Sequence, residues 1–172
     1  MFNIPKFKER SFLVYGLGLP GRSVVKFFKK KNIKKFKVWD DKYADLYKSY
    51  RSLNLNTTLK KVDFIVLSPG ISLIRSKKLK KYKKKIITDI DLFYLFKDRP
   101  KSIVVTGTNG KSTTCKLIAH LFKKNKINYS LGGNIGNPVL GIKNFKKDYI
   151  IIEASSFQLS HSKFIHPDIA LF

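Results

Sequence analysis

Short runs of apolar residues alternate along the first half of the chain with segments in which apolar residues recur every three or four positions. The first pattern predicts buried β-strands and the second predicts amphipathic helices. The predicted strands are residues 11–15, 35–39, 62–67 and 85–88. The predicted helices are residues 21–31, 43–51, 71–82, and one that starts with Asp89 as its N-cap and runs to residue 96. This alternation predicts an α/β fold, in which helices cover both faces of a mainly parallel sheet.

The second half shows the same alternation with fewer strands. The predicted strands are residues 103–105, 127–131 and 149–153, and a further strand starts at Asp168. A sheet of about three parallel strands is smaller than the average sheet, so we expect this second domain to be truncated. The polar segment 98–101 contains a proline and predicts the domain boundary. The domains expected are therefore residues 1–99 and an incomplete unit of residues 100–172.

The net charge of +25 changes this picture less than its size suggests. A strongly positive field favours anionic ligands and is compatible with nucleic-acid binding. The excess is almost entirely lysine, however, and arginine, which is preferred for bidentate phosphate and base contacts, is rare. We therefore expect no nucleic-acid partner, although small anionic nucleotides would still be favoured.

Cysteine usage and hydropathy predict a cytoplasmic protein. Cys115 is the only cysteine, so no internal disulfide can form, as is usual in a reducing compartment. We expect its side chain to lie in the core of the domain. The sequence has no apolar run near 18 residues and no signal-peptide pattern, so we expect no membrane span.

The sequence Thr-Gly-Thr-Asn-Gly-Lys-Ser-Thr at residues 106–113 carries the clearest chemical signal. It lies between a predicted strand and a predicted helix, where a glycine-rich loop can close its backbone N–H groups around phosphate oxygens. Lys111 would supply a positive charge for the β- and γ-phosphates, and the Ser112 hydroxyl would hold Mg²⁺. The residues expected to bind ATP are Gly107, Thr108, Asn109, Gly110, Lys111, Ser112 and Thr113.

This loop is shorter than the usual phosphate loop, because Val105 stands where the first glycine is expected. The alternative is a tight strand–helix turn with a solvated lysine. Glu153 ends another predicted strand of the same domain, and an acid there can hold Mg²⁺ together with Ser112. Ser155 and Ser156 follow, and either of them could instead cap a helix.

A second phosphate-binding pattern lies near the N-terminus. Residues 16–21, Gly-Leu-Gly-Leu-Pro-Gly, fit the Gly-x-Gly-x-x-Gly fingerprint, and Asp40 ends the next strand, where a ribose-binding acid is expected. The alternative is a glycine-rich packing turn, with Asp40 and Asp41 as turn residues. Ser-Pro-Gly at residues 68–70 lies at the same carboxyl edge and is compatible with a ligand contact or with a simple turn.

Taken together, these segments resemble the Mur ligase family of peptidoglycan synthesis over essentially the whole chain. The motifs occur in the family's order: Gly-Leu-Gly-Leu at 16–19, Ser-Pro-Gly-Ile at 68–71, Asp-Ile-Asp-Leu-Phe at 89–93, the phosphate loop at 106–113, Gly-Gly-Asn-Ile-Gly at 132–136 and Ser-Ser-Phe-Gln-Leu at 155–159. The resemblance implies a Rossmann-like domain that binds the UDP substrate, followed by a P-loop-type central domain that binds ATP. It also implies a reaction in which ATP converts the carboxylate of UDP-N-acetylmuramoyl-L-alanine into an acyl phosphate. The amine of D-glutamate then displaces phosphate to form an amide.

The resemblance also assigns residues. It implies substrate contacts at Gly18, Leu19, Pro20, Asp40, Ser68, Pro69, Gly70, Asn134 and Ser156. Lys111 would be the catalytic residue, and Ser112 and Glu153 would be the Mg²⁺ ligands. Pro20 stands where the family commonly has a threonine, which puts the detail of uridine binding in question but not the ATP site.

The resemblance implies a family of three domains, and we expect these 172 residues to correspond to the first two, without the C-terminal domain. We therefore expect a monomeric fragment that binds nucleotides without completing the reaction. One alternative is a non-catalytic nucleotide-binding module. Another is a ligase similar to folylpolyglutamate synthetase, although that family lacks the first domain. An NAD-binding dehydrogenase domain would rest on residues 16–21 alone.

Overall fold

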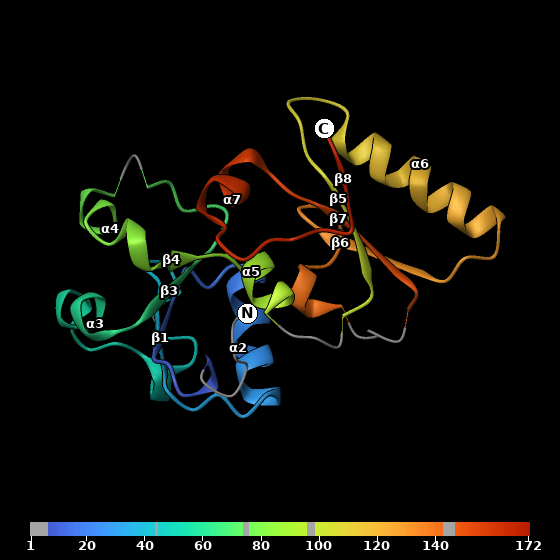
Figure 1. Ribbon diagram of the computed structural model, residues 1–172. Helices are drawn as coiled ribbons and strands as arrows, with labels where there is room; N and C mark the ends of the chain where they lie inside the picture. Colours follow the sequence, from blue (N-terminus) through green and yellow to red (C-terminus); the bar gives the residue numbers. More distant parts are fainter. Residues whose placement is uncertain (1–6, 44, 74–75, 96–98, 143–146) are drawn as a thin grey trace. The chain divides into compact units, whose positions relative to one another are not determined.

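The computed structural model describes residues 7–43, 45–73, 76–95, 99–142 and 147–172 (Figure 1). The chain forms two compact units, which divide between Asp89 and Ile90. This division lies ten residues before the boundary expected from the polar segment around Pro100. The reason is that the helix α5 (Asp89–Tyr94) bonds to the second unit: Asp91 accepts the backbone N–H groups of Lys163 and Phe164 at 2.8 and 2.7 Å.

The first unit is built on a four-stranded parallel sheet with the order β2-β1-β3-β4. The strands are β1 (Phe12–Tyr15), β2 (Phe36–Trp39), β3 (Phe64–Leu67) and β4 (Ile86–Ile87). All four were predicted from the apolar runs. The helix α2 (Leu19–Lys30) follows β1. Lys29 and Lys30 lie in its last turn, where their positive charges interact favourably with the negative end of the helix dipole.

The remaining helices of this unit differ from the sequence-based expectation. In place of the helix expected over residues 43–51, the described residues form a 3₁₀ turn, η1 (Lys48–Tyr50), because Tyr47 takes a left-handed conformation with φ of 57°, while residue 44 lies outside the described residues. The helix α3 (Leu55–Lys61) was not predicted, and it is capped by the Asn54 side chain, which accepts the Thr57 N–H. The helix expected over residues 71–82 is reduced to α4 (Lys77–Lys80) and is followed by η2 (Lys83–Lys85), while residues 74 and 75 lie outside the described residues.

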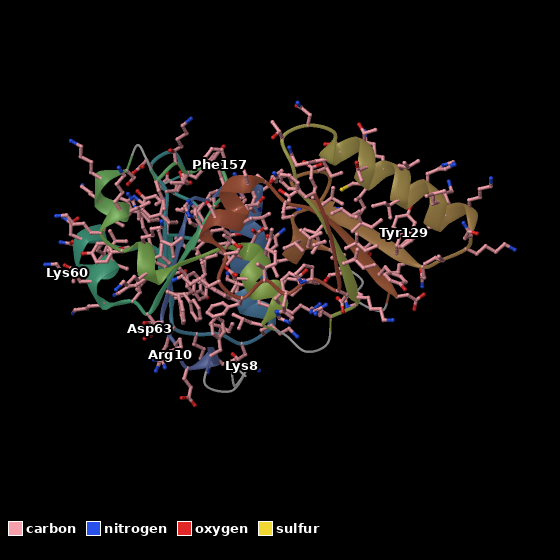
Figure 2. The ribbon with its side chains drawn as sticks, turned by 45° about the horizontal axis from the view of Figure 1, so that its top comes forward. Lys8, Arg10, Lys60, Asp63, Tyr129 and Phe157 are labelled. Carbon is pink, nitrogen blue, oxygen red and sulfur yellow. The ribbon has the colours of Figure 1, made fainter. Side chains whose placement is uncertain are left out.

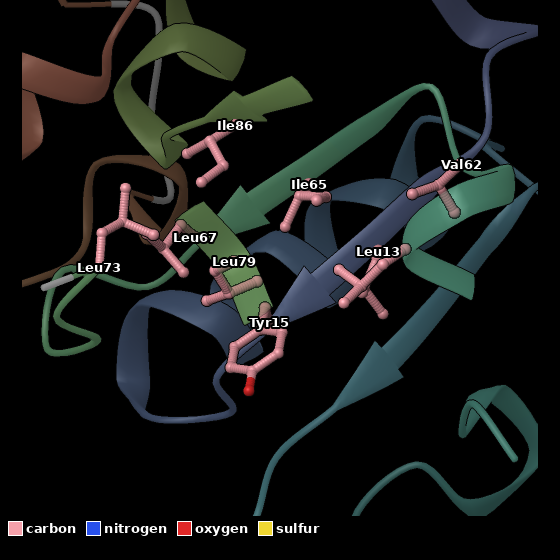
Figure 3. Packing of buried hydrophobic residues seen from close by; sticks show 9 residues of the cluster. Leu13, Tyr15, Val62, Ile65, Leu67, Leu73, Leu79 and Ile86 are labelled. Atoms are coloured by element: carbon pink, nitrogen blue, oxygen red, sulfur yellow. The ribbon is translucent and has the colours of Figure 1, made fainter. Parts of the chain in front are cut away.

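The core of the first unit lies on both faces of this sheet. Leu13 and Tyr15 of β1 point to the face covered by α3 and α4, where Leu59 and Leu79 are fully buried (Figure 3). Phe12 points to the other face, and its ring lies 4.9 Å from that of Phe28 on α2. Each fully buried side chain of this size contributes about 1.5–3 kcal/mol.

The second unit has its own parallel sheet, with the order β6-β7-β5-β8. Its strands are β5 (Lys101–Val105), β6 (Tyr129–Gly133), β7 (Tyr149–Glu153) and β8 (Ile169–Leu171). The described sheet thus has four strands, whereas about three were expected. Its helical segments are α6 (Lys111–Lys124), η3 (Val139–Gly141) and α7 (Ser156–His161).

The helix α6 packs on this sheet through a small apolar cluster. Cys115 and Ala119 of α6 meet Ile103, Val105 and Ile151 of the sheet. Burial, with the nearby Glu153 charge as a second cause, raises the pKa of the Cys115 thiol to about 11. The thiol is therefore protonated at neutral pH, and the expectation of a core cysteine is confirmed. Within the parts of the chain that the structure describes, no helix is both long and apolar enough to cross a membrane.

The start of β8 is anchored to β5 by a charged cluster. Asp168 accepts hydrogen bonds at 2.7 Å from the Arg99 guanidinium and from the Ser102 N–H, and at 2.9 Å from the Ser102 hydroxyl. Burial acts to raise the pKa of Asp168, but the bonds from Arg99 and Ser102 outweigh it and hold that pKa well below its ordinary value of 3.8. A depressed pKa in the folded state means that the ionised carboxylate stabilises the unit above pH 3.8, and that this contribution is lost as the pH falls below it.

We expect Asp168→Asn to lower the free energy of unfolding of the second unit by about 1–2 kcal/mol at pH 7, since charged hydrogen bonds are lost at a partly solvated site. The difference from wild type should shrink as the pH falls below 3.8, because the Asp168 carboxyl then takes up a proton in the unfolded chain while it is still ionised in the folded unit. Urea denaturation at several pH values is the measurement. Asp148→Asn, at an exposed carboxylate of the same unit, is the matched control and should stay near wild type. Equal losses in the two variants would contradict the role given to Asp168.

Candidate nucleotide-binding sites

The phosphate-loop sequence forms a turn between β5 and α6. Gly107 and Gly110 have φ of 129° and 76°. Glycine adopts such positive φ values without the steric cost that other residues pay. Gly110 is the N-cap of the 14-residue helix α6, and no side-chain cap is found there among the described residues. The first helical bond is donated by the Thr114 N–H to the Gly110 carbonyl at 2.8 Å. The N–H groups of the first turn and the helix dipole therefore favour an anion at this end.

Lys111 lies across this loop. Its ammonium group donates to the carbonyls of Gly107 at 2.7 Å and Thr108 at 3.0 Å. The positive charge is thus kept over the loop by its own backbone, and Thr108 and Asn109 are exposed beside it. A lysine held in this way can exchange carbonyl oxygens for phosphate oxygens by rotating its side chain.

Ser112 and Glu153 are 41 residues apart in sequence, and the sheet brings them together. The Ser112 hydroxyl donates to a Glu153 carboxylate oxygen at 2.7 Å. Glu153 ends β7 opposite Val105 of β5, and it is 5% exposed. One carboxylate and one hydroxyl are hard oxygen ligands, which fits Mg²⁺ bound to few protein groups together with substrate phosphates. Among the described residues no group of three or more His, Cys, Asp or Glu side chains could hold a metal ion.

The loop after β6 approaches Glu153 from the other side. A Cβ atom on Gly133 would lie 2.2 Å from the Glu153 carbonyl oxygen, so only glycine fits there. The Asn134 N–H donates to that same carbonyl at 2.9 Å, while the Asn134 side chain is exposed. The structure therefore places the Asn134 backbone beside the backbone of Glu153, at the end of β7.

Ser155 and Ser156 have different places at the start of α7. Ser155 is the N-cap of α7 and forms a capping box with Gln158, as the helix-cap alternative predicted. Ser156 is the first residue of α7 and is exposed, and Phe157 next to it is 66% exposed (Figure 2). Of this pair, Ser156 has the side chain that is open to a ligand.

In the first unit, residues 16–21 form a close turn between β1 and α2. A Cβ atom on Gly21 would lie 1.8 Å from the Gly16 carbonyl oxygen, and Gly16 has φ of 96°. Ser68, after β3, donates its hydroxyl to the same Gly16 carbonyl at 2.9 Å. The three candidate residues Gly18, Leu19 and Pro20 begin α2, with Gly18 as the N-cap and Leu19 71% exposed.

Asp40 clamps the backbone of this turn. One carboxylate oxygen accepts the Leu17 N–H, and the other accepts the N–H groups of Lys42 and Tyr43 at 2.7 and 2.9 Å. Burial acts to raise the pKa of Asp40, but the hydrogen bonds from Leu17, Tyr43 and Lys42 outweigh it and lower that pKa. Asp40 is thus a turn residue, which is the alternative that the sequence left open. It also lies beside the glycine-rich turn at residues 16–21.

Sequence reasoning missed Arg22. Its Nε donates to the Leu17 carbonyl at 2.8 Å, and its guanidinium lies 4.8 Å from the centre of the Tyr43 ring. Arg22 and Asp40 therefore hold the two sides of Leu17, and Arg22 puts a positive charge in the first turn of α2. The available signal was an arginine one residue after the fingerprint in a lysine-rich chain.

Both units thus carry a glycine loop, at the carboxyl end of the strand β1 or β5, that leads into a helix. Residues 105–172 match the family model described as the Mur ligase middle domain. This match and the sequence similarities below show that the chain is similar to members of the Mur ligase family.

The individual relatives point to one branch of that family. The chain is 40% identical over 162 residues to the UDP-N-acetylmuramoylalanine–D-glutamate ligase of Rickettsia prowazekii. This alignment covers 89% of this chain and 36% of that protein. It is 39% identical over 175 residues to the ligase of the same name from Buchnera aphidicola. This second alignment covers 94% of this chain and 39% of that protein. The chain thus spans less than two fifths of the length of either relative. A solved structure, the UDP-N-acetylmuramate:L-alanyl-gamma-D-glutamyl-meso-diaminopimelate ligase from Neisseria meningitides, aligns at 13% identity with a TM-score of 0.46, over 94% of this chain and 59% of that chain.

We expect Gly21→Ala to destabilise the first unit by about 1–3 kcal/mol or more, because its methyl group would overlap the Gly16 carbonyl. Gly70→Ala is the matched control, since no described atom lies within 4 Å of the added methyl group. It should change stability by less than about 0.5 kcal/mol. Urea denaturation of the two variants makes the comparison. A stable Gly21→Ala protein would mean that the turn is not as tight as described.

Proposed function

We propose that this chain provides the nucleotide-binding units of an ATP-dependent ligase that joins D-glutamate to UDP-N-acetylmuramoyl-L-alanine. The observation that carries the proposal is the Ser112–Glu153 contact at 2.7 Å beside the glycine loop of α6. That arrangement has the groups needed to hold a nucleotide triphosphate with a divalent cation. The sequence similarity to the two D-glutamate ligases supports the choice of substrates.

The proposed ATP site uses each residue of the loop in a distinct way. Backbone N–H groups of residues 107–113 bind phosphate oxygens, and the Lys111 ammonium leaves its loop carbonyls to contact the β- and γ-phosphates. Ser112 and Glu153 are the Mg²⁺ ligands, and the cation, when bound, neutralises phosphate charge. The work of these residues is positioning and electrostatic stabilisation, which dominates phosphoryl transfer.

The proposed reaction has two steps. The γ-phosphoryl group moves from ATP to the carboxylate of UDP-N-acetylmuramoyl-L-alanine, which gives an acyl phosphate and ADP. The amine of D-glutamate then attacks the acyl carbon, phosphate leaves with the bonding electron pair, and the nitrogen loses a proton. Lys111 lies at the site of the first step and is the proposed catalytic residue.

The first unit is the proposed site for the UDP part of the substrate. Gly18, Leu19 and Pro20 present the start of α2 to the diphosphate. Residues 68–70 lie beside that turn through the Ser68–Gly16 bond. Asp40 borders the same turn, and its carboxylate, already bound to three N–H groups, keeps the turn shaped for the ligand. Asn134 and Ser156 of the second unit are the proposed contacts to the sugar-phosphate part. We place the protein in the cytoplasm as a monomer.

Lys111→Ala is expected to weaken binding of Mg-ATP by about ten- to a hundredfold, because it removes a charge-assisted contact worth about 1.5–3 kcal/mol. Isothermal titration of ATP with Mg²⁺ is the measurement. Lys116→Ala is the matched control, since Lys116 is an exposed lysine of the same helix beyond its first turn. If both variants bind ATP as well as wild type does, Lys111 is not a phosphate ligand.

We expect the first unit to prefer uridine diphosphate compounds to NAD. The test records chemical-shift changes on addition of UDP-N-acetylmuramoyl-L-alanine and, separately, of NAD. Amides of residues 16–21 and of Asp40 should move with the uridine compound. Movement with NAD and not with the uridine compound would favour a dehydrogenase-type domain and would overturn the proposed substrate.

A further inference from the structure

A second cationic site lies away from both glycine loops. In the first unit, α3 and the segment from α4 to Tyr82 enclose a pocket of about 360 Å³. Its charged lining consists of Lys60, Lys77, Lys78 and Lys81, and Asn56 and Tyr82 complete the polar lining. The volume is in the range of small-molecule sites. None of these residues belongs to the turn at residues 16–21 or to its partners.

The segment that carries Lys77, Lys78 and Lys81 contains no acidic residue. The chain has no Asp or Glu between residues 64 and 88, whereas seven of the nine residues 77–85 are lysine. The ion pairs found within the described residues involve none of the four. Like charges gathered around one pocket repel one another, and an anion of high charge density would relieve that repulsion.

The walls of this pocket are fixed by one further lysine. The Lys85 ammonium donates to the carbonyls of Leu59, Lys60 and Val62 at 3.2, 2.7 and 2.7 Å, and so binds the end of α3 to η2. The same ammonium lies 5.8 Å from the centre of the Tyr82 ring. Leu59, at the base, is part of the buried core. Lys85 and Leu59 thus hold the end of α3 beside η2, and Lys60 extends outward from α3 (Figure 2).

The charged ends of the lysines around the pocket suit linked phosphates, while apolar atoms form most of the pocket surface. Lysine ammonium groups are compact charges on flexible stems, and they can donate to the many oxygens of a phosphate chain. Arginine, by contrast, has a planar guanidinium group that binds a single carboxylate through two parallel hydrogen bonds. The Tyr82 hydroxyl and the Asn56 amide add neutral donors. We propose that this pocket binds a small linear polyphosphate, with Lys78 and Lys81 as two of its main ligands. The proposal is independent of the ligase function.

The test is titration of inorganic tripolyphosphate into ¹⁵N-labelled protein without Mg²⁺. The Lys111→Ala background limits binding at the phosphate loop of the second unit. Changes in the NMR chemical shifts of the backbone amides of residues 77–82 measure binding at this pocket. Lys78→Gln/Lys81→Gln should weaken the affinity read from these amides by about tenfold or more, as expected for two lost charged contacts at a solvated site.

The matched control is Lys80→Gln/Lys83→Gln, which removes the same charge from the same segment at exposed lysines outside the pocket lining. It should weaken binding by less than about threefold, through screened long-range attraction alone. Circular dichroism confirms that both variants are folded. Equal weakening in the two variants, or no shift of residues 77–82, would overturn the proposal. Binding to anionic vesicles or to single-stranded RNA that exceeds binding to tripolyphosphate would also overturn it in favour of a surface for a larger polyanion.

Discussion

The parallel pairing of β5 with β7 is the constraint on which the phosphate-loop site depends. It sets Val105 opposite Glu153, and the Ala154 N–H continues the ladder to the Val105 carbonyl at 3.0 Å. Both strands therefore end at one edge, and the Ser112 hydroxyl at the start of α6 reaches the Glu153 carboxylate. A slip of one residue would turn Glu153 to the opposite face of the sheet and separate the pair.

Four of the acidic residues that the structure describes bind backbone N–H groups and hold turns or loops in place. The sequence holds 11 acids against 36 lysines and arginines. Asp40 holds the turn after β1, Asp63 accepts the Ser11 N–H at the start of the same strand, and Asp91 and Asp168 hold loops of the second unit. Acids used in this way are already bonded to the backbone, and the 11 acids do not balance the 36 lysines and arginines. The result is a positive field that suits nucleotides and, at the pocket between α3 and α4, a concentration of charge that the fold itself does not need.

Local patterns predicted the strands better than the short helices. Strands such as β1 and β7 are continuous apolar runs buried in a sheet, which a sequence shows directly. The short helices depend on single residues: Asn54 caps α3, and the left-handed Tyr47 interrupts the helix expected over residues 43–51. The domain boundary moved from residue 99 to residue 89 because Asp91 bonds to Lys163 and Phe164, a contact between residues more than 70 positions apart.

The sequence by itself determined the α/β class, the two glycine loops, and the residues that could bind phosphate, because glycine, lysine and hydroxyl spacing follows from local strand–turn–helix geometry. The spacing also predicted that Ser112 and Glu153 lie together, but it did not determine their direct contact. Only the tertiary structure decided that Ser112 donates to Glu153, that Asp40 and Arg22 hold Leu17, and that Lys85 binds the end of α3 to η2. These contacts join distant segments, and they form only when sheet pairing and helix packing bring those segments to one place.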